Sequence, residues 1–345
     1  MVYQYPFNRH IMEIAPDFKL KFGHLSQRAM VEGGSKHVMP QRPYLIYDVF
    51  SDRRLAGNPL AVVLDSKGLD DAAMQKIAGE FNLSETVFVS PAANAAHTAA
   101  IRIFTPKYEL PFAGHPTVGT AIALAERGSS DGPANDAAAL LVLEEKIGNV
   151  RCAVTHEGGL AFAEFDLPQL SRRLDFEPDN EAIAAAIGLG PHEIGFENHQ
   201  PSLWTAGVPY LAVPVAGLEA MAQIRFDGPA WLELAPRRGD GNPACAYLYC
   251  RETIGHDSAF HARMFVPGLP TYEDPATGSA VAAFSGAVLH FDQPRDGTHT
   301  YWIEQGVEMG RPSRIRLEIE VKGLAAKTAR IGGNAVKIAE GVLSL

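Results

Sequence analysis

The sequence predicts an α+β protein built from two similar lobes. Its 345 residues exceed what one hydrophobic core usually organises, so two lobes are expected. From residue 42 onward, short runs rich in β-forming residues alternate with runs whose apolar residues recur at helical spacing. A short motif also occurs once in each half of the chain, and each copy runs into an Ala-rich helix.

The composition is typical of a globular protein that binds neither nucleic acid nor membranes. Hydrophobic residues make up 46% and charged residues 20% of the chain. The net charge of −10 leaves no cationic surplus for phosphates or anionic lipids, and no stretch is long and apolar enough to suggest a membrane span. Cys152, Cys245 and Cys250 are too few for a disulfide framework or a four-ligand zinc site. We therefore expect a cytoplasmic protein.

Four segments are predicted to be helices, and the fourth, 279–289, follows the second copy of the motif. Apolar residues at helical spacing predict a helix over 70–81, and acidic residues stand at its start. The small apolar residues of 117–127 predict a helix that is buried on most sides, as the central helix of a lobe would be. The second half has a predicted helix over 181–187. Strands are predicted over 44–49, 59–64, 85–90, 100–105, 140–143, 148–154, 160–166, 209–213, 245–250, 259–266 and 335–343.

The repeated motif joins a titratable residue to a helix. Residues 115–121 read His-Pro-Thr-Val-Gly-Thr-Ala, and residues 274–280, 159 positions later, read Asp-Pro-Ala-Thr-Gly-Ser-Ala. Each copy follows a predicted strand and leads into a predicted helix, 117–127 in the first and 279–289 in the second. The repeat therefore predicts the same architecture in both lobes.

Helix starts of this kind can bind an anion. Their first N–H groups lack partners within the helix and carry a partial positive charge, and a glycine lets a ligand approach closely. Two such starts that face each other would form a small anion-binding cleft between the lobes. In the alternative interpretation, proline and glycine merely cap two buried helices. A titratable residue at the same place in both copies favours the cleft.

Residues 82–86 read Asn-Leu-Ser-Glu-Thr, residues 111–117 read Pro-Phe-Ala-Gly-His-Pro-Thr and residues 273–280 read Glu-Asp-Pro-Ala-Thr-Gly-Ser-Ala. Together with six further segments, they resemble the PhzF-like isomerase family, whose relatives include diaminopimelate epimerase and proline racemase. The resemblance covers residues 44–345. It implies the diaminopimelate epimerase-like fold, in which two pseudo-symmetric lobes are each a β-barrel-like sheet around a central helix, and it implies a homodimer. The segments that carry it are 48–50, 57–62, 74–75, 82–86 (Asn-Leu-Ser-Glu-Thr), 101–106, 111–117, 273–280 (Glu-Asp-Pro-Ala-Thr-Gly-Ser-Ala), 305–306 and 309–313.

The resemblance also implies a set of site residues. Glu85 corresponds to the general acid/base of the family, and His115 and Asp274 correspond to polar groups around the reacting centre. A carboxylate cradle is implied at Ser279 and the backbone of Gly278. The full set of implied substrate-binding residues is Asn58, Gly114, Gly278 and Ser279.

Our hypothesis is proton transfer by one carboxyl group, without a cofactor. A small carboxylate substrate binds the helix starts, and Glu85 removes a proton from carbon and returns it elsewhere. Burial is expected to raise the pKa of Glu85 toward neutrality, while Asp274 and His115 share a proton or bind polar groups of the substrate. A two-thiol mechanism, as in the related epimerases, is not expected because no cysteine lies in either repeat. The histidines form no metal-binding pattern.

Two other classes of function remain open. A non-catalytic protein that binds a small molecule or another protein would keep the same fold. A serine hydrolase that uses Ser279 and His115 is disfavoured, because Ser279 does not lie in a Gly-x-Ser-x-Gly elbow. The presence of Glu85, His115 and Asp274 together favours an isomerase or epimerase.

The predicted organisation has three parts. Residues 1–41 show no clear period and are predicted to be a disordered N-terminal extension. Residues 42–153 together with 331–345 form the predicted first lobe. Residues 154–330 form the predicted second lobe.

Overall fold

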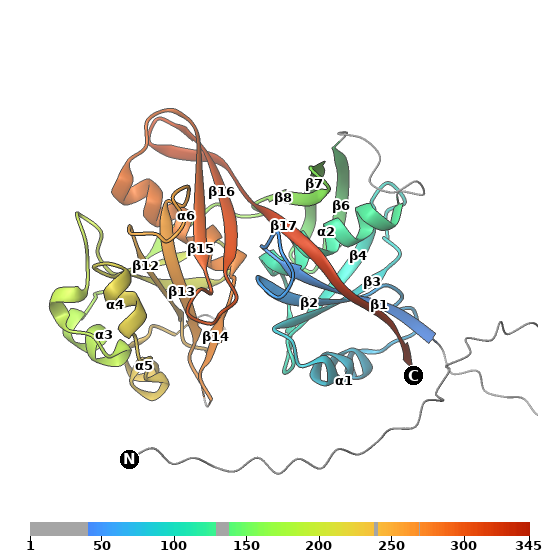
Figure 1. Ribbon diagram of the computed structural model, residues 1–345, viewed down its shortest axis with the longest axis horizontal. Helices are drawn as coiled ribbons and strands as arrows, with labels where there is room; N and C mark the ends of the chain where they lie inside the picture. Colours follow the sequence, from blue (N-terminus) through green and yellow to red (C-terminus); the bar gives the residue numbers. More distant parts are fainter. Residues whose placement is uncertain (1–40, 129–137, 238–240, 269) are drawn as a thin grey trace, which may run out of the picture. The chain divides into compact units, whose positions relative to one another are not determined.

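The structure is a computed structural model that describes residues 41–128, 138–237, 241–268 and 270–345 (Figure 1). Apart from residue 41, the predicted N-terminal extension lies outside the described residues. Among the helices that the structure describes, none has the length and apolar character needed to cross a membrane. The predicted cytoplasmic location and the predicted homodimer stay predictions.

The first lobe is a closed ring of strands around one helix. Its strands hydrogen-bond in the order β1-β2-β3-β4-β6-β7-β8, and the last strand of the chain, β17, closes the ring between β8 and β1. Inside it, every residue of α2 from Gly114 to Ala123 is buried. The elements are β1 Gln41–Val49, β2 Asn58–Val63, α1 Asp71–Phe81, β3 Glu85–Ser90, β4 Ala99–Phe104, β5 Glu109–Leu110, α2 Gly114–Gly128, β6 Ala139–Glu145, β7 Gly148–Glu157 and β8 Leu160–Asp166.

The second lobe repeats this order of elements. Its strands hydrogen-bond as β9-β10-β11-β12-β13-β15-β16-β17, and the parallel pair β11–β12 repeats the parallel pair β2–β3. The elements are β9 Arg172–Leu174, α3 Asn180–Ile187, a 3-10 turn at Pro191–Glu193, β10 Ser202–Thr205, β11 Pro209–Pro214, α4 Leu218–Gln223, α5 Gly228–Leu234, β12 Cys245–Cys250, β13 Phe260–Val266, β14 Tyr272–Asp274, α6 Gly278–Asp292, β15 Gly297–Gln305, β16 Ser313–Lys322 and β17 Ala325–Ser344.

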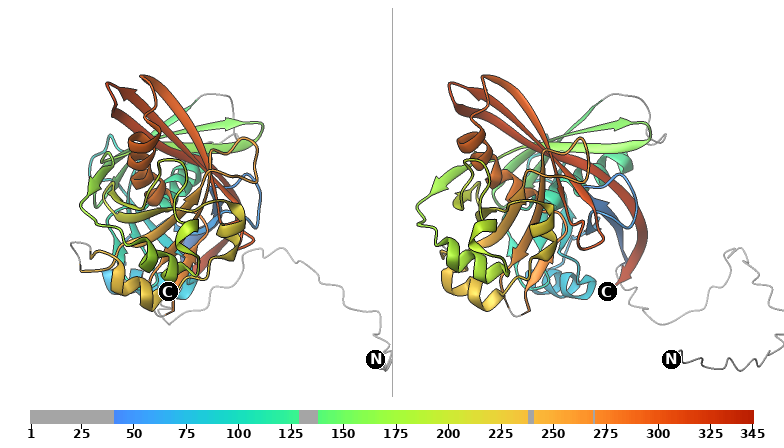
Figure 2. Two further views of the ribbon diagram at one scale, coloured as in Figure 1. Left: turned by 90° about the vertical axis from the view of Figure 1, so that its left-hand side faces the viewer. Right: turned by 60° about the vertical axis from the view of Figure 1, so that its left-hand side comes forward.

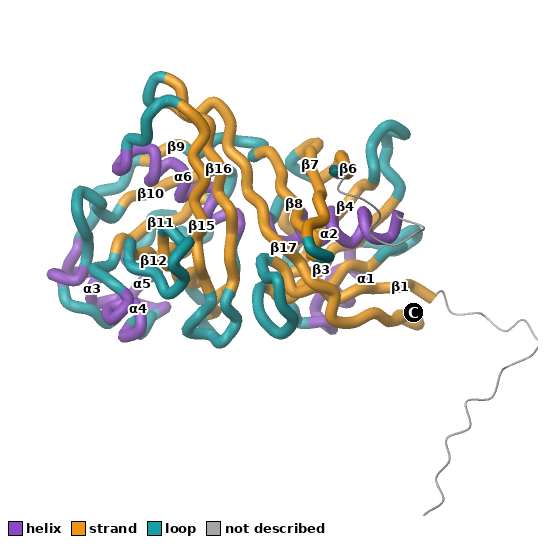
Figure 3. Tube along the Cα trace, turned by 45° about the horizontal axis from the view of Figure 1, so that its top comes forward, coloured by secondary structure: helices purple, strands orange, loops and turns teal. Residues whose placement is uncertain are grey.

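Alternating side chains build two cores in the second lobe. Successive residues of a strand point to opposite faces of the sheet. On β12, Tyr247 belongs to the core around α6, whereas its neighbours Ala246 and Leu248 belong to the core formed with α3, α4 and α5. Figure 3 shows these three helices gathered on one side of the lobe. Because both faces are covered there, β11 and β12 are almost continuously apolar. The strand β16 instead alternates apolar and charged residues.

The strand β17 belongs to both lobes. Its first part pairs with β16, residues Arg330 to Ala335 pair with β8, and residues from Ala335 onward pair with β1. The right-hand view of Figure 2 shows its dark red end beside the blue β1. The lobe boundary predicted at residue 153 falls inside β7. Because β7 and β8 both pair within the first ring, we propose that its main segment ends at Asp166.

Most of the predicted helices and strands are confirmed, with two informative exceptions. The last strand, β17, begins at Ala325 rather than at residue 335. The helix α1 begins after Asp70, whose side chain accepts a hydrogen bond from Ala73 N at 2.8 Å. The central helix α2, however, begins at Gly114 rather than at residue 117. His115 and Pro116 therefore lie in its first turn, where a proline has no intrahelical N–H bond to lose.

Candidate active site

The starts of the two central helices lie against each other. A Cβ atom added to Gly114 would stand 2.9 Å from the Cα of Gly278, and one added to Gly278 would stand 3.1 Å from the Cα of Gly114. No side chain fits at either position without displacing backbone. The predicted meeting of two helix starts is therefore confirmed, and their free N–H groups provide partial positive charge in one small region.

The two copies of the sequence motif, however, do not superimpose in the way their letters suggest. Both central helices begin with glycine, so the counterpart of Gly278 is Gly114, and the counterpart of Ser279 is His115. The matching letters had instead paired Gly278 with Gly119. Gly119 lies inside α2, where an added Cβ would stand 2.6 Å from a methyl group of Leu60. This glycine permits packing and starts no helix.

The predicted equivalence of His115 and Asp274 is consequently wrong. Asp274 ends β14, before the helix, and the corresponding strand β5 ends in Leu110. Pro116 lies inside a first helical turn, whereas Pro275 lies in the turn between strand and helix. Because proline is tolerated at both places, the same letters occur in two different local structures.

Two parallel strands of the first lobe deliver Asn58 and Glu85 to the helix starts. Glu85 begins β3 and lies beside Leu60 of β2, and Asn58 begins β2. Leu60 and Val87 belong to the core around α2. Since side chains two residues apart share a face of the sheet, Asn58 and Glu85 point toward the same interior as Leu60 and Val87, at its open end.

Glu85 and His115 face each other as an unsatisfied pair. Oε2 of Glu85 lies 3.3 Å from Nε2 of His115, and their side chains are 16% and 4% exposed. Neither atom has a hydrogen-bond partner among the described residues. Burial, with the nearby carboxyl group of Asp274, raises the pKa of Glu85 well above its ordinary value, and burial lowers the pKa of His115 to about 3. His115 is thus neutral, and both atoms are available to a ligand.

Asp274 is held by hydrogen bonds on both of its oxygens. Oδ1 accepts from Asn58 Nδ2 at 2.9 Å and from Ser84 Oγ at 3.2 Å, and the hydroxyl of Tyr272 stands 3.4 Å away. Oδ2 accepts from Thr277 Oγ1. Burial raises the pKa of Asp274, and these hydrogen bonds oppose the rise. The carboxyl group is oriented before any ligand arrives.

Asn58 joins the two lobes at the site. Besides its bond to Asp274, its Nδ2 donates to Ala276 O at 2.9 Å and lies 3.4 Å from Nδ1 of His115. Its Oδ1 is buried and has no hydrogen-bond partner among the described residues. Asn58, predicted to bind substrate, therefore spends its donors on the protein and retains one oxygen for a ligand.

Three residues at the site were not assigned from the sequence. Ser279 Oγ lies 2.7 Å from the hydroxyl of Tyr210, which β11 presents toward α6. Tyr210 stands outside every motif, so only the strand pairing reveals it. Ser84 lies within a motif beside Glu85, a position that would have marked it. Phe50 is fully buried at a positive φ of 63°, and its ring lies behind the start of α6, 3.1 Å from a Cβ added to Gly278.

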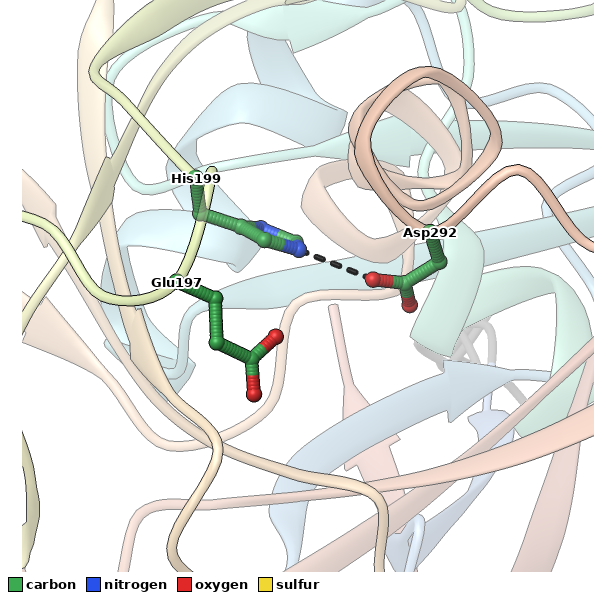
Figure 4. Close-up of side chains that lie close together, drawn as sticks. All are labelled: Glu197, His199 and Asp292. Atoms are coloured by element: carbon green, nitrogen blue, oxygen red, sulfur yellow. Dashed lines mark hydrogen bonds and ion pairs between the residues drawn. The ribbon is translucent and has the colours of Figure 1, made fainter.

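A second polar cluster, at the end of α6, is not a metal site. Glu197, His199 and Asp292 approach one another closely, and Figure 4 shows the bond of 2.8 Å between His199 and Asp292. The guanidinium of Arg251 already lies among them, with Nη2 at 2.7 Å from Asp292, 3.2 Å from Glu197 and 3.2 Å from His199. This cation supplies the positive charge that a metal ion would bring.

One protein family, two related proteins and one solved structure are similar to this chain. The model of the PhzC-PhzF family, described as "Phenazine biosynthesis-like protein", matches residues 47–341. An uncharacterized isomerase of Mesorhizobium japonicum is 64% identical over 88% of this chain and 99% of its own length. Trans-2,3-dihydro-3-hydroxyanthranilate isomerase of Pseudomonas aeruginosa is 33% identical over 86% and 98%. The crystal structure of a PhzF-family phenazine biosynthesis protein of Bacillus anthracis matches with a TM-score of 0.77 and 27% identity, and covers 89% of this chain and 100% of its own.

Proposed function

The chain belongs to the PhzC-PhzF family of phenazine biosynthesis-like proteins and is an isomerase, and we propose that its Glu85 moves a proton on a small carboxylate substrate bound between the lobes. The predicted family, its fold and the prediction of an isomerase are confirmed. One observation is the main support for Glu85 as the acid/base. Its Oε2 and Nε2 of His115 are buried 3.3 Å apart without other partners.

The substrate carboxylate is proposed to bind at the two helix starts. Gly114 and Gly278 let the two helix starts approach each other closely, and the N–H groups there favour an anion. The hydroxyl of Ser279, held by Tyr210, adds a donor at the same place. A carboxylate in this position lies next to the side chains of Glu85 and His115, which bracket the group that reacts.

The proposed reaction needs only one base. Glu85 in its ionised form accepts the proton of a C–H bond beside an unsaturated or carbonyl group, and the electron pair of that bond moves into the adjacent π system. The same carboxyl group then gives the proton to another carbon of that system and regenerates its ionised form. The raised pKa of Glu85 makes its ionised form a stronger base for the first step.

A single carboxyl group favours isomerisation over epimerisation. A proton returned by Glu85 to the same carbon arrives on the face from which it left, and this restores the starting configuration. A proton delivered to a different carbon gives a new compound from the same face. Trans-2,3-dihydro-3-hydroxyanthranilate, the substrate named for a relative 33% identical to this chain, is an unsaturated carboxylate and is a first candidate.

Neither alternative function accounts for the site as well. A serine hydrolase needs a base on Ser279, but the hydroxyl partner of Ser279 is Tyr210, whereas His115 faces Asn58 and Glu85. A binding protein has no need to bury a carboxyl group of raised pKa beside an unpartnered histidine, since that arrangement costs stability.

Hydrogen exchange into a substrate tests the proposal directly. The purified full chain is incubated in deuterated water with dihydroaromatic carboxylates, including the candidate above, and with chiral amino acids, and NMR follows deuterium at carbon. We expect exchange by the wild type and a loss of about 100- to 10,000-fold in Glu85→Gln. Glu80→Gln, on the exposed side of α1, is the matched control and should exchange at the wild-type rate.

Two outcomes would count against the proposal. Equal exchange by the wild type and Glu85→Gln would remove Glu85 from its role. Binding of a panel member that gives no product and shows no exchange of a carbon-bound hydrogen would favour the non-catalytic alternative.

A further inference from the structure

The side chain of Arg311 lies on the loop of the first lobe that precedes Asn58. Its Nε donates to Gly57 O at 2.7 Å, and its Nη2 donates to Ala56 O at 2.8 Å and to Oδ1 of Asp48 at 2.6 Å. Asp48 is fully buried, and its other oxygen accepts from Leu55 N at 2.6 Å. One guanidinium and one carboxylate thus close the loop that leads into β2.

The backbone of Arg311 belongs to a second-lobe loop that rests on the turn of Asp274. Gln305, at the start of this loop, donates from Nε2 to Asp274 O at 2.8 Å. A Cβ added to the next residue, Gly306, would stand 2.5 Å from Pro275 O, so these two backbones are in contact. Arg311 N then donates to Gly306 O at 2.9 Å. Arg311 therefore touches the Asn58 loop with its side chain and the Asp274 turn through its own loop.

We propose that Arg311 is a positioning residue for the proton transfer, which holds the amide of Asn58 against Asp274 and so aligns the half of the site from the first lobe with the half from the second. This inference rests on the proposed function of Glu85. It also gives a role to Asp48, Gly57 and Arg311. These residues lie in segments that carry the family resemblance, and the proposed catalytic residues do not explain why.

The three acceptors around the side chain of Arg311 require the planar guanidinium group of an arginine. Three acceptors, two carbonyl oxygens and one carboxylate oxygen, are spread over Nε and Nη2 of a single planar group. A lysine ammonium keeps the charge opposite Asp48 but presents one nitrogen, so it cannot reach all three in this geometry. With lysine, the bond that Nε of Arg311 makes to Gly57 O has no donor, and Gly57 is the residue directly before Asn58.

A double-mutant comparison tests the proposal by activity. Arg311→Lys is expected to lower kcat by roughly 10- to 100-fold, as small misplacements of reacting groups do, while leaving the protein folded. Asn58→Ala should lose at least as much, because it also removes the oxygen that Asn58 retains for a ligand. The double variant should be no slower than Asn58→Ala, because the alignment that Arg311 provides acts through Asn58. Arg314→Lys is the matched control, since Arg314 is partly exposed and pairs with the surface residue Asp257.

An NMR titration tests the proposal without reference to catalysis. The bond from Asn58 lowers the pKa of Asp274, so a displaced Asn58 should raise the titration midpoint of its carboxyl carbon in Arg311→Lys and in Asn58→Ala alike. The other titratable groups around Asp274 are Glu85, His115 and Tyr272, and Arg311→Lys replaces none of them. Should Arg311→Lys not fold, Asp48→Asn, which weakens the same clamp without leaving a buried unpaired charge, must give the same upward shift.

The outcomes separate this inference from the proposed function. An upward shift of Asp274 without any exchange activity in the wild type would support the positioning role and contradict only the proposed reaction. The positioning role would be overturned if folded Arg311→Lys had the wild-type titration midpoint of Asp274 and the wild-type kcat. It would also be overturned if the losses in kcat from Arg311→Lys and Asn58→Ala multiplied in the double variant.

Discussion

The two lobes have the same order of elements but carry different chemistry at equivalent places. The strand β3 begins with Glu85, and its counterpart β12 begins with Cys245, each beside a parallel partner strand. The central helices begin Gly114-His115 in one lobe and Gly278-Ser279 in the other. Only the glycines are common to both. The repeated fold thus supplies two helix starts that face each other, while the proposed acid/base group comes from one lobe alone.

The largest expected difference between the lobes concerns Glu85 and Cys245. Glu85→Gln should lose about 100- to 10,000-fold in exchange rate, because an amide cannot accept the proton. Cys245→Ser should stay within roughly twofold, since it changes one buried atom in a strand that holds no proposed acid or base. Rates of deuterium exchange measured by NMR check both. A large loss in Cys245→Ser would mean that the lobes share the chemistry more evenly than we propose.

The lobes also differ in how they bury histidine. Burial lowers the pKa of His115 to about 3. Burial alone would also lower the pKa of His261, but its hydrogen bonds to Glu304 and Glu308, both at 2.8 Å, outweigh this and raise it to about 9. Because the folded-state pKa of His261 lies above its ordinary value, its stabilisation is complete below about pH 6.5 and is lost as the pH rises through about 9.

We therefore expect the free energy of unfolding to fall through this alkaline range by on the order of 3 kcal/mol. His261→Gln should be less stable at neutral pH and should show a flatter dependence above it. Urea denaturation at a series of pH values measures both. His192→Gln, at an exposed position, should follow the wild-type curve. An unchanged curve in His261→Gln would show that the ion pairs of this histidine do not stabilise the fold.

Because the two helix starts face each other through Gly114 and Gly278, we expect substitutions of these two glycines to have equal effects. Gly114→Ala and Gly278→Ala each push a Cβ into the facing helix start, to 2.9 and 3.1 Å from a Cα atom. Both should lower kcat/KM by about 10- to 100-fold, because the two starts must move apart. Gly128→Ala, where an added Cβ meets nothing within 4 Å, is the control. A loss confined to one of the two glycines would break the symmetry.

The smallest expected effect concerns Gly119, the glycine that the sequence motif had paired with Gly278. Gly119→Ala places a Cβ 2.6 Å from Leu60 and 2.7 Å from Val49, and such overpacking should reduce the free energy of unfolding by about 1–2 kcal/mol. Gly79→Ala, in the exposed part of α1 with only Pro106 O at 3.8 Å, should instead stabilise by about 0.5–1 kcal/mol. Urea denaturation compares them. Equal stabilisation by both would mean that Gly119 has room for a side chain.

Much of the fold could be predicted from the sequence, because local patterns were strong. The cap at Asp70, the apolar spacing of α1 and the β-rich runs each depend on neighbours a few residues away. For the site, the repeated motif predicted a helix start in each half of the chain, whereas Gly114, Asn58 and Glu85 came from the family resemblance. The closed ring of strands came from the family resemblance, because hydrogen bonding between β17 and β1 joins residues nearly 300 positions apart and leaves no local signal.

The sequence by itself determined which segments become strands and helices, and through the family resemblance it identified Gly114, Gly278 and the candidate acid/base Glu85. The tertiary structure alone decided that Ser279 is the counterpart of His115, that Glu85 and His115 face each other unpartnered, and that Arg311 clamps the Asn58 loop. The reason is physical. Propensity and periodicity act over a few residues, whereas burial, pKa shifts and hydrogen bonds between lobes arise only when distant segments come together.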